Sequence, residues 1–164
     1  MSAKLSRILF ATDLSENSFF AFGHVVDLAK MSGAEIHILH VVEPLSEDAK
    51  ITLLLFIQDE QKRNAAMASR VEPARARLTK RQDEFWGGLS DADRKVRDQI
   101  VSMEVVEGHA AEKILSSADS KKCDLIVIGT HQHGFSHTFL GSTAKRILRR
   151  ARIPTLIVPH QGGM

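Results

Sequence analysis

Two glycines near the C-terminal end of the chain flank a polar loop whose surroundings suit the binding of an anion. Gly129 follows the apolar run from Asp124 to Ile128, and Gly141 comes directly before Ser142 and Thr143 at the start of a helical pattern. The first backbone N–H groups of a helix have no partner within that helix, and the helix dipole places positive charge at the same end. This arrangement therefore predicts a loop that binds a charged group such as phosphate.

Asp13 is the second residue that could contact a ligand. It follows the apolar run from Arg7 to Thr12, and in a doubly wound sheet this strand would lie beside the strand that ends at Gly129. The Asp13 carboxylate could accept a hydrogen bond from an exocyclic amine or a ribose hydroxyl. Asp also commonly caps its own turn or the following helix, and the local sequence does not decide between the two roles.

Three histidines lie within the loop between the glycines. His131, His133 and His137 could converge on a transition metal, but their spacing matches no zinc pattern and no cysteine is near. We therefore expect no metal site and treat them as polar loop residues, with His131 as a candidate donor to a phosphate. Histidines in the predicted helices and strands are expected to have structural roles: His24, His37 and His40.

Other catalytic patterns fit poorly. No lysine precedes the Ser142-Thr143 pair in the manner of a Walker A loop, so fast phosphoryl transfer is not expected. Ser136 lacks the second glycine of a nucleophile elbow, which argues against a hydrolase triad. The single cysteine, Cys123, is expected to pack as a small apolar residue rather than to act as a nucleophile.

The elements that must position these residues alternate between strands and helices. Strand patterns cover Arg7–Thr12, Glu35–Val42, Ile100–Val106, Asp124–Ile128 and Thr155–Val158, and helical patterns cover Glu16–Met31 behind a Ser15 cap, Ser46–Trp86 with a break or kink at Pro73, Ala110–Ala118 and a C-terminal helix after Gly141. We predict one α/β domain over residues 1–164, a Rossmann-like, doubly wound open parallel sheet of five strands in the order 3-2-1-4-5, with helices on both faces. Such a sheet binds ligands beyond the carboxyl ends of its strands. Prolines on both sides of the last strand place it near a sheet edge.

Composition limits the class of protein. Hydrophobic residues make up 43% of the 164 residues and charged residues 26%, as in ordinary globular domains, and a net charge of +2 gives no reason to expect a nucleic-acid partner. One cysteine permits no internal disulfide, and no signal peptide is apparent, so a cytoplasmic location is expected. No apolar run approaches the ~20 residues of a membrane span.

Two clusters of one residue type remain. A basic run, from Lys145 to Arg152, is predicted mainly to complement the dipole of the C-terminal helix, with an anionic partner as the alternative. The apolar run Ile51–Ile57 is predicted to be a buried helix turn, with a partner or dimer surface as the alternative. The long segment Ser46–Arg97 suggests no function of its own.

Four fragments in order resemble the universal stress protein family. RILFATDLSENS resembles its first strand and turn, HILHVVEP its second strand, VEGHAAEKIL its third turn and helix, and GTHQHGFSHTFLGSTAKRILRRARIPTLIVP its C-terminal signature. The resemblance extends from the first strand to the last residues. It implies a five-stranded α/β domain that dimerises through its last strand, here Thr155 to Val158, and no settled enzymatic reaction.

The resemblance also implies an adenine nucleotide site, with ATP, with or without Mg²⁺, as the expected ligand. Asp13 and the Val41 backbone would hold adenine, Thr12 and Gly129 would lie near the nucleoside, and the phosphates would contact three residues: Gly141, Ser142 and Thr143. His131 is included as a further phosphate donor.

The loop departs from the pattern Gly-x-x-Gly-x9-Gly-Ser/Thr of ATP-binding members. Gln132 stands in place of the second glycine, and the loop is one residue short, although Gly134 could substitute after a shift in register. Glycine allows a positive φ and close approach of the backbone to phosphate, which a glutamine restricts.

The sequence therefore supports two functions. The chain is expected to be a homodimeric, nucleotide-responsive regulator with at most slow ATP hydrolysis. The alternative is a dimeric interaction protein of the same fold that holds no nucleotide and signals through the segment after the second strand.

Overall fold

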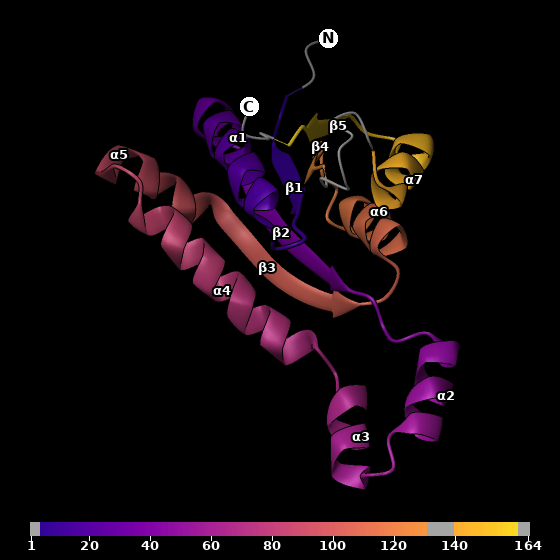
Figure 1. Cartoon of the computed structure of the whole chain (residues 1–164). Coiled ribbons are helices and arrows are strands. Elements are labelled where there is room, and N and C mark those ends of the chain that lie inside the picture. Colours follow the sequence, from indigo (N-terminus) through magenta and orange to yellow (C-terminus); the bar gives the residue numbers. More distant parts are fainter. Residues whose placement is uncertain (1–3, 131–139, 161–164) are drawn as a thin grey trace.

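One parallel five-stranded sheet forms the centre of the molecule (Figure 1). The structure is a computed structural model, and it describes residues 4–130 and 140–160. The strands are β1 (Arg7–Ala11), β2 (Glu35–Val42), β3 (Ile100–Glu107), β4 (Leu125–Gly129) and β5 (Thr155–Val158). All neighbouring strands pair in parallel in the order β3-β2-β1-β4-β5. The predicted fold class and strand order are confirmed, and β5 is an edge strand.

Helices pack on both faces of this sheet. The helices of the described residues are α1 (Glu16–Ser32), α2 (Glu47–Phe56), α3 (Glu60–Met67), α4 (Val71–Gly87), α5 (Asp91–Arg94), α6 (Ala110–Ser120) and α7 (Ser142–Arg150), with a 3₁₀ turn η1 (Lys95–Gln99) before β3, and not all of them contact the sheet. One face is covered by α1 and α4, and the other by α6 and α7 (Figure 1). Among the described residues, no helix is long and apolar enough to cross a membrane.

Helix α1 begins and ends at residues that the sequence identifies. The Ser15 side chain accepts a hydrogen bond from the Ser18 N–H at 3.1 Å, as an N-cap does. At the other end Gly33 has φ 71°, the left-handed conformation that favours glycine at a helix C-terminus. These local signals give α1 the length that brings the chain back to the start of β2.

Aromatic side chains join α1 to α4 above the sheet. The Phe22 ring lies 5.0 Å from Phe10, 4.8 Å from Phe85 and 5.8 Å from Trp86, measured between ring centroids. The Trp86 indole N–H donates to Gln82 Oε1 at 3.1 Å, so the polar atom of this buried ring is satisfied. This cluster fixes α4 against the body of the domain.

The segment between β2 and α4 differs from the prediction of a long helix over Ser46–Trp86. A break at residues 68–70 comes just before Pro73, which lies in the first turn of α4, where a proline is tolerated. A second break, at residues 57–59, was not predicted; there Asp59 caps α3 by accepting from the Gln61 and Lys62 N–H groups. Helices α2 and α3, residues 47–67, contain no buried residue and stand away from the sheet (Figure 1). We call them the arm.

The prediction that Ile51–Ile57 is buried is wrong. Within this run Leu55 is 70% exposed and Phe56 is 80% exposed, and Ile51 and Leu54 are also exposed. The run is too apolar for one stripe of a surface helix, yet no helix or strand within residues 4–130 and 140–160 covers it. Apolar composition predicted a helix here correctly and its burial incorrectly.

Candidate functional site

A cavity of about 250 Å³ lies beyond the carboxyl ends of β1, β2 and β4, which we call the crevice. Its walls come from the ends of these strands and from the first turns of α6 and α7. Of the eight residues predicted to bind nucleotide, seven line it: Thr12, Asp13, Val41, Gly129, Gly141, Ser142 and Thr143. The position agrees with the rule that open α/β sheets bind ligands where helices leave the sheet to opposite faces.

Thr12 is held in the crevice wall by contacts on all its polar atoms. Its N–H donates to the Leu39 carbonyl at 2.9 Å, and its hydroxyl oxygen accepts from the Leu14 N–H at 3.0 Å and from the Ser18 hydroxyl at 2.6 Å. The Thr12 carbonyl accepts from His40 Nδ1 at 2.7 Å, which assigns the proton of a neutral His40 ring to Nδ1. Thr12 therefore has a fixed position in the cavity wall, where β1 and β2 end.

Asp13 lines the crevice and also stabilises the turn that follows it. Its Oδ1 accepts from the Ser15 N–H at 2.9 Å and from the Ser15 hydroxyl at 2.5 Å. The structure therefore shows the capping role that the sequence left open, and the same turn holds the carboxylate at the edge of the cavity. Its contact with a ligand stays a prediction. Leu14, inside this turn, has φ 66°, an uncommon conformation for a leucine.

A neighbouring side chain leaves little room for a Cβ at Gly129. A Cβ at this position would lie 2.9 Å from Asn17 Nδ2. The Asn17 amide donates to the Thr130 carbonyl at 2.7 Å and lies 3.4 Å from the Val158 carbonyl, so it joins α1 to the ends of β4 and β5. The need for glycine here comes from the close approach of α1, whereas the sequence suggested only closeness to a ligand.

Helix α7 directs its first turn into the crevice. Gly141 is its N-cap, with φ −63° and ψ 165°, and no side chain of the described residues caps the helix. No acidic residue lies in this first turn, and Gly141, Ser142 and Thr143 all line the cavity. Uncapped N–H groups and the positive end of the helix dipole therefore face the cavity, an arrangement that favours an anion.

Several predicted residues of the loop lie outside the described residues. His131, Gln132, His133, Gly134, Ser136 and His137 all fall within residues 131–139. The role of His131 as a phosphate donor, the effect of Gln132 and the rejected histidine metal site therefore stay predictions.

Sequence reasoning missed two residues that shape the crevice. His40 fixes Thr12, a structural contact of the kind expected for it, but the sequence did not place it in the cavity wall. Asn17 holds the junction after Gly129 from the opposite helix, 113 positions away along the chain from Thr130. Only its place in the first turn after Asp13 could have drawn attention to it.

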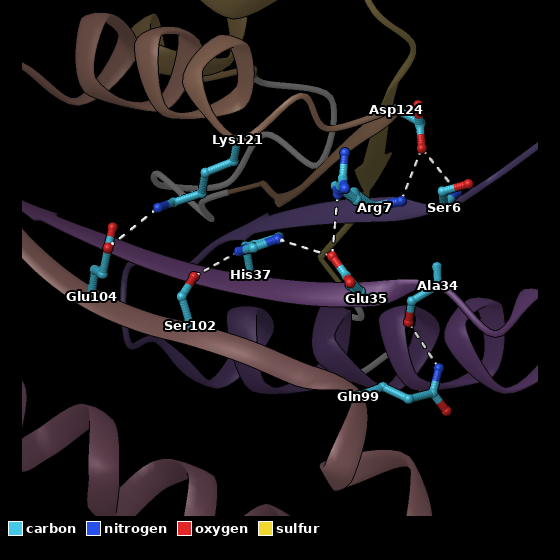
Figure 2. Close-up of polar contacts among 10 residues, drawn as sticks. All are labelled: Ser6, Arg7, Ala34, Glu35, His37, Gln99, Ser102, Glu104, Lys121 and Asp124. Carbon is cyan, nitrogen blue, oxygen red and sulfur yellow. Dashed lines mark hydrogen bonds and ion pairs between the residues drawn. The ribbon is translucent and has the colours of Figure 1, made fainter.

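A second group of polar side chains lies toward the amino ends of the strands (Figure 2). Asp124 Oδ2 accepts from the Ser6 and Arg7 N–H groups, each at 2.8 Å, and Arg7 pairs with Glu35 at 3.2 Å. These contacts tie the entry of β1 to the entries of β2 and β4. Their groups bind one another, so this cluster is structural.

His37 is buried within the same region. Its Nδ1 lies 2.7 Å from Ser102 Oγ, and its Nε2 lies 3.8 Å from Glu35 Oε2, beyond hydrogen-bonding distance. Burial lowers the pKa of His37, and the positive charge of Lys121 lowers it further, while Glu35 acts in the opposite direction. The ring is therefore mainly neutral at pH 7, as expected for a structural histidine.

Cys123 is buried beside the start of β4. Burial raises the pKa of its thiol to about 11, and the neighbouring Asp124 carboxylate contributes. A thiol in this state supplies very little thiolate at neutral pH. The expected role as a packing residue fits these surroundings.

The family is established by comparison with known proteins. The sequence profile described as "Universal stress protein family" matches residues 4–159. The chain belongs to this family. It is 29% identical over 158 residues to universal stress protein MJ0531 of Methanocaldococcus jannaschii, a match that covers 93% of this chain and 81% of that protein. It is 26% identical to MJ0577 of the same organism, over 98% of this chain and 99% of that protein.

Solved structures of this family share the fold. Universal stress protein UspA from Lactobacillus plantarum superposes with a TM-score of 0.65 at 22% identity, covering 96% of this chain and 99% of that one. A universal stress protein crystallised in complex with cAMP gives a TM-score of 0.61 at 22% identity, covering 98% of this chain and all of that one. At these identities the likeness establishes the fold alone.

Proposed function

We propose that this universal stress protein binds an adenine nucleotide, with ATP as the expected ligand, and acts as a nucleotide-responsive regulator rather than an efficient enzyme. The proposal depends mainly on one observation: the uncapped first turn of α7 faces the same cavity as Thr12, Asp13 and Val41. N–H groups that can donate to an anion thus lie across the cavity from polar groups that suit a nucleoside. The cAMP complex of a relative supports an adenine ligand for this fold.

The roles follow from position in the crevice. The Val41 backbone and the Asp13 carboxylate would contact adenine, and Gly129 would lie beside the sugar. Backbone N–H groups at Ser142 and Thr143 would donate to phosphate oxygens, and such bonds are stronger than those to neutral acceptors. The crevice holds no lysine among its described lining residues, which agrees with binding rather than fast phosphoryl transfer.

Titration calorimetry with ATP, with and without Mg²⁺, tests the proposal. Protein freed of ligand should bind one nucleotide per chain, and the double variant Gly141→Val and Ser142→Val should abolish binding, because bulk at the start of α7 blocks approach to its N–H groups. Thr52→Val, which changes an exposed residue of the arm, is the matched control and should bind as the unaltered protein does. Absence of heat with ATP, ADP, AMP and cAMP would show the proposal to be wrong.

Slow ATP hydrolysis is the enzymatic extension of this proposal. It is measured as phosphate release at saturating nucleotide. A rate equal to that of buffer alone would exclude ATP hydrolysis, and the proposed role as a nucleotide-binding regulator would stand.

A second candidate function is a dimeric interaction protein that holds no nucleotide. The exposed apolar side chains of α2 favour it, since soluble monomers seldom expose several large apolar residues together. Dimerisation would use β5, an edge strand on which Leu156 is exposed. Native mass spectrometry separates the candidates: a dimer with bound nucleotide supports the regulator, and an empty dimer supports the interaction protein.

A further inference from the structure

A second cavity lies on the face of the sheet covered by α6 and α7, at the opposite end from the crevice. Its volume is about 580 Å³, within the range of small-molecule sites and larger than the crevice. The described residues that line it are Leu115, Ser116, Ala118, Asp119, Lys122, Cys123, Ile126, Arg150, Arg152 and Ile153. We call it the basic cavity.

The floor of the basic cavity is apolar. Ala118, Cys123 and Ile126 are buried, and Leu115 and Ile153 pack against the same core cluster. The raised pKa of Cys123 agrees with a floor that is poor in water. A ligand with an apolar body could cover this surface.

The rim of the basic cavity is cationic. Lys122 comes from the turn after α6, Arg150 from the last turn of α7, and Arg152 from the segment before β5. Within residues 4–130 and 140–160, none of the three forms an ion pair, and Asp119 is the one carboxylate of the described lining. These cations come from segments that are separate in the sequence, and the packing of α6 and α7 on the sheet brings them to one cavity.

The backbone at Lys122 adds to this pattern. Lys122 has φ 53° and follows the C-cap of α6, a position where glycine is usual because the left-handed conformation disfavours a side chain. Its N–H donates to the Asp119 carbonyl at 3.1 Å, and the Cys123 N–H donates to the Ala118 carbonyl at 2.9 Å, which holds the turn in place. The turn thereby carries a cation to the rim of the cavity.

We propose that the basic cavity binds an amphiphilic anion, a single-chain molecule with an apolar body and a phosphate head. The body would lie on the partly exposed Leu115 and Ile153, above the buried Ala118 and Ile126, and the head would contact Arg150 and Arg152 at the rim. A guanidinium group suits this role, because its fixed N–H donors match phosphate oxygens. The site is separate from the crevice, so it does not depend on the nucleotide proposal.

Decyl phosphate, used below its micelle concentration, is the probe for calorimetry on the full chain. We expect one site per chain, with weaker binding of both inorganic phosphate, which lacks the body, and 1-decanol, which lacks the charge. The double variant Arg150→Gln and Arg152→Gln should weaken binding by at least about tenfold. The matched variant Arg146→Gln and Arg149→Gln, at exposed positions of α7 outside the cavity, should change it less than about threefold.

Methyl NMR locates the probe. The Leu115 and Ile153 methyl signals should shift, whereas Ile36, in the core cluster of the other face, should not. Saturating ATP should leave these shifts unchanged.

The proposal is overturned if no probe binds, if both double variants weaken binding equally, or if inorganic phosphate binds as well as decyl phosphate. It is also overturned if ATP displaces the probe or if the methyl shifts lie elsewhere. In each of these cases the cations serve only to complement the C-terminal ends of α6 and α7.

Discussion

Helices α1 and α2 begin in the same way and have opposite surroundings. Each follows a strand of the sheet and starts with a serine N-cap: Ser15 accepts from the Ser18 N–H, and Ser46 accepts from the Ala49 N–H, both at 3.1 Å. α1 buries a stripe against the sheet, whereas α2 has no buried residue although it contains the most apolar run of the chain. The start of a helix is thus encoded locally, and its burial depends on a partner element.

The two helices also differ in what they contribute to the crevice. Contacts of α1 with β1 and β4 hold Thr12, Asn17 and Gly129 at the edge of the crevice. Among the residues that the structure describes, the arm contributes to neither the crevice lining nor the core clusters, so we expect it not to be needed to keep the crevice in shape. Changes in α1 should therefore alter stability and the site together, and changes in the arm should alter neither.

Replacing one phenylalanine in each helix gives the largest expected contrast. Phe22→Ala removes a fully buried ring that touches three other aromatic rings, and we expect the free energy of unfolding to fall by about 3–5 kcal/mol. Phe56→Ala, on the arm, should change it by less than about 0.5 kcal/mol. Urea unfolding measures both variants. A loss above about 1 kcal/mol for Phe56→Ala would mean that the arm is packed against protein.

A pair of glycine substitutions tests the contact between α1 and β4. Gly129→Ala places a Cβ 2.9 Å from Asn17 Nδ2, so the amide must move away from the Thr130 carbonyl. We expect a loss of about 1–3 kcal/mol in unfolding free energy, together with weaker binding of any crevice ligand. Gly23→Ala, within α1 where nothing lies within 4 Å of the added Cβ, should instead stabilise the protein by about 0.5–1 kcal/mol.

Thermal or urea unfolding distinguishes the two glycine variants. If Gly129→Ala proved as stable as the unaltered protein, Asn17 would not be fixed in the position described. If Gly23→Ala were destabilising, the space beside α1 would be occupied, for example by a second chain.

The framework of the fold could be read from the sequence because its signals are local. Alternating strand and helix patterns, Ser15 and Gly33 at the ends of α1, and Pro154 and Pro159 around β5 were enough to give the element order and the sheet. Once the strand order is known, the carboxyl ends of β1 and β4 must be neighbours. That is why most of the predicted site residues line one cavity.

The remaining features depend on contacts between distant parts of the chain. Asn17 gains its role only when α1 packs beside the end of β4, and its place in the first turn of α1 is the one local hint of that role. The basic cavity joins Lys122 to Arg150 and Arg152, which the sequence showed only as members of basic or mixed segments. The exposure of Leu55 and Phe56 was missed because apolar composition does not say whether another element will cover a helix.

The smallest expected effect is a dependence of the unfolding free energy on pH, which should arise in the packed sheet and not in the exposed arm. The arm contains no histidine, whereas His37 is buried in the sheet, facing Arg7 from β1, Glu35 from β2, Ser102 and Glu104 from β3 and Lys121 at the end of α6. Because burial lowers its pKa in the folded protein below the ordinary 6.5, the unfolded chain binds a proton at a higher pH than the folded chain does. The free energy of unfolding should therefore fall as the pH drops below 6.5, and this fall should end near the lowered folded pKa.

His37→Gln, which keeps a hydrogen-bonding group beside Ser102, should show a smaller decrease between pH 7 and pH 5, measured by urea unfolding. Equal decreases in the two proteins would show that His37 takes up its proton equally well in the folded state, and that burial at this point of the sheet does not exclude charge.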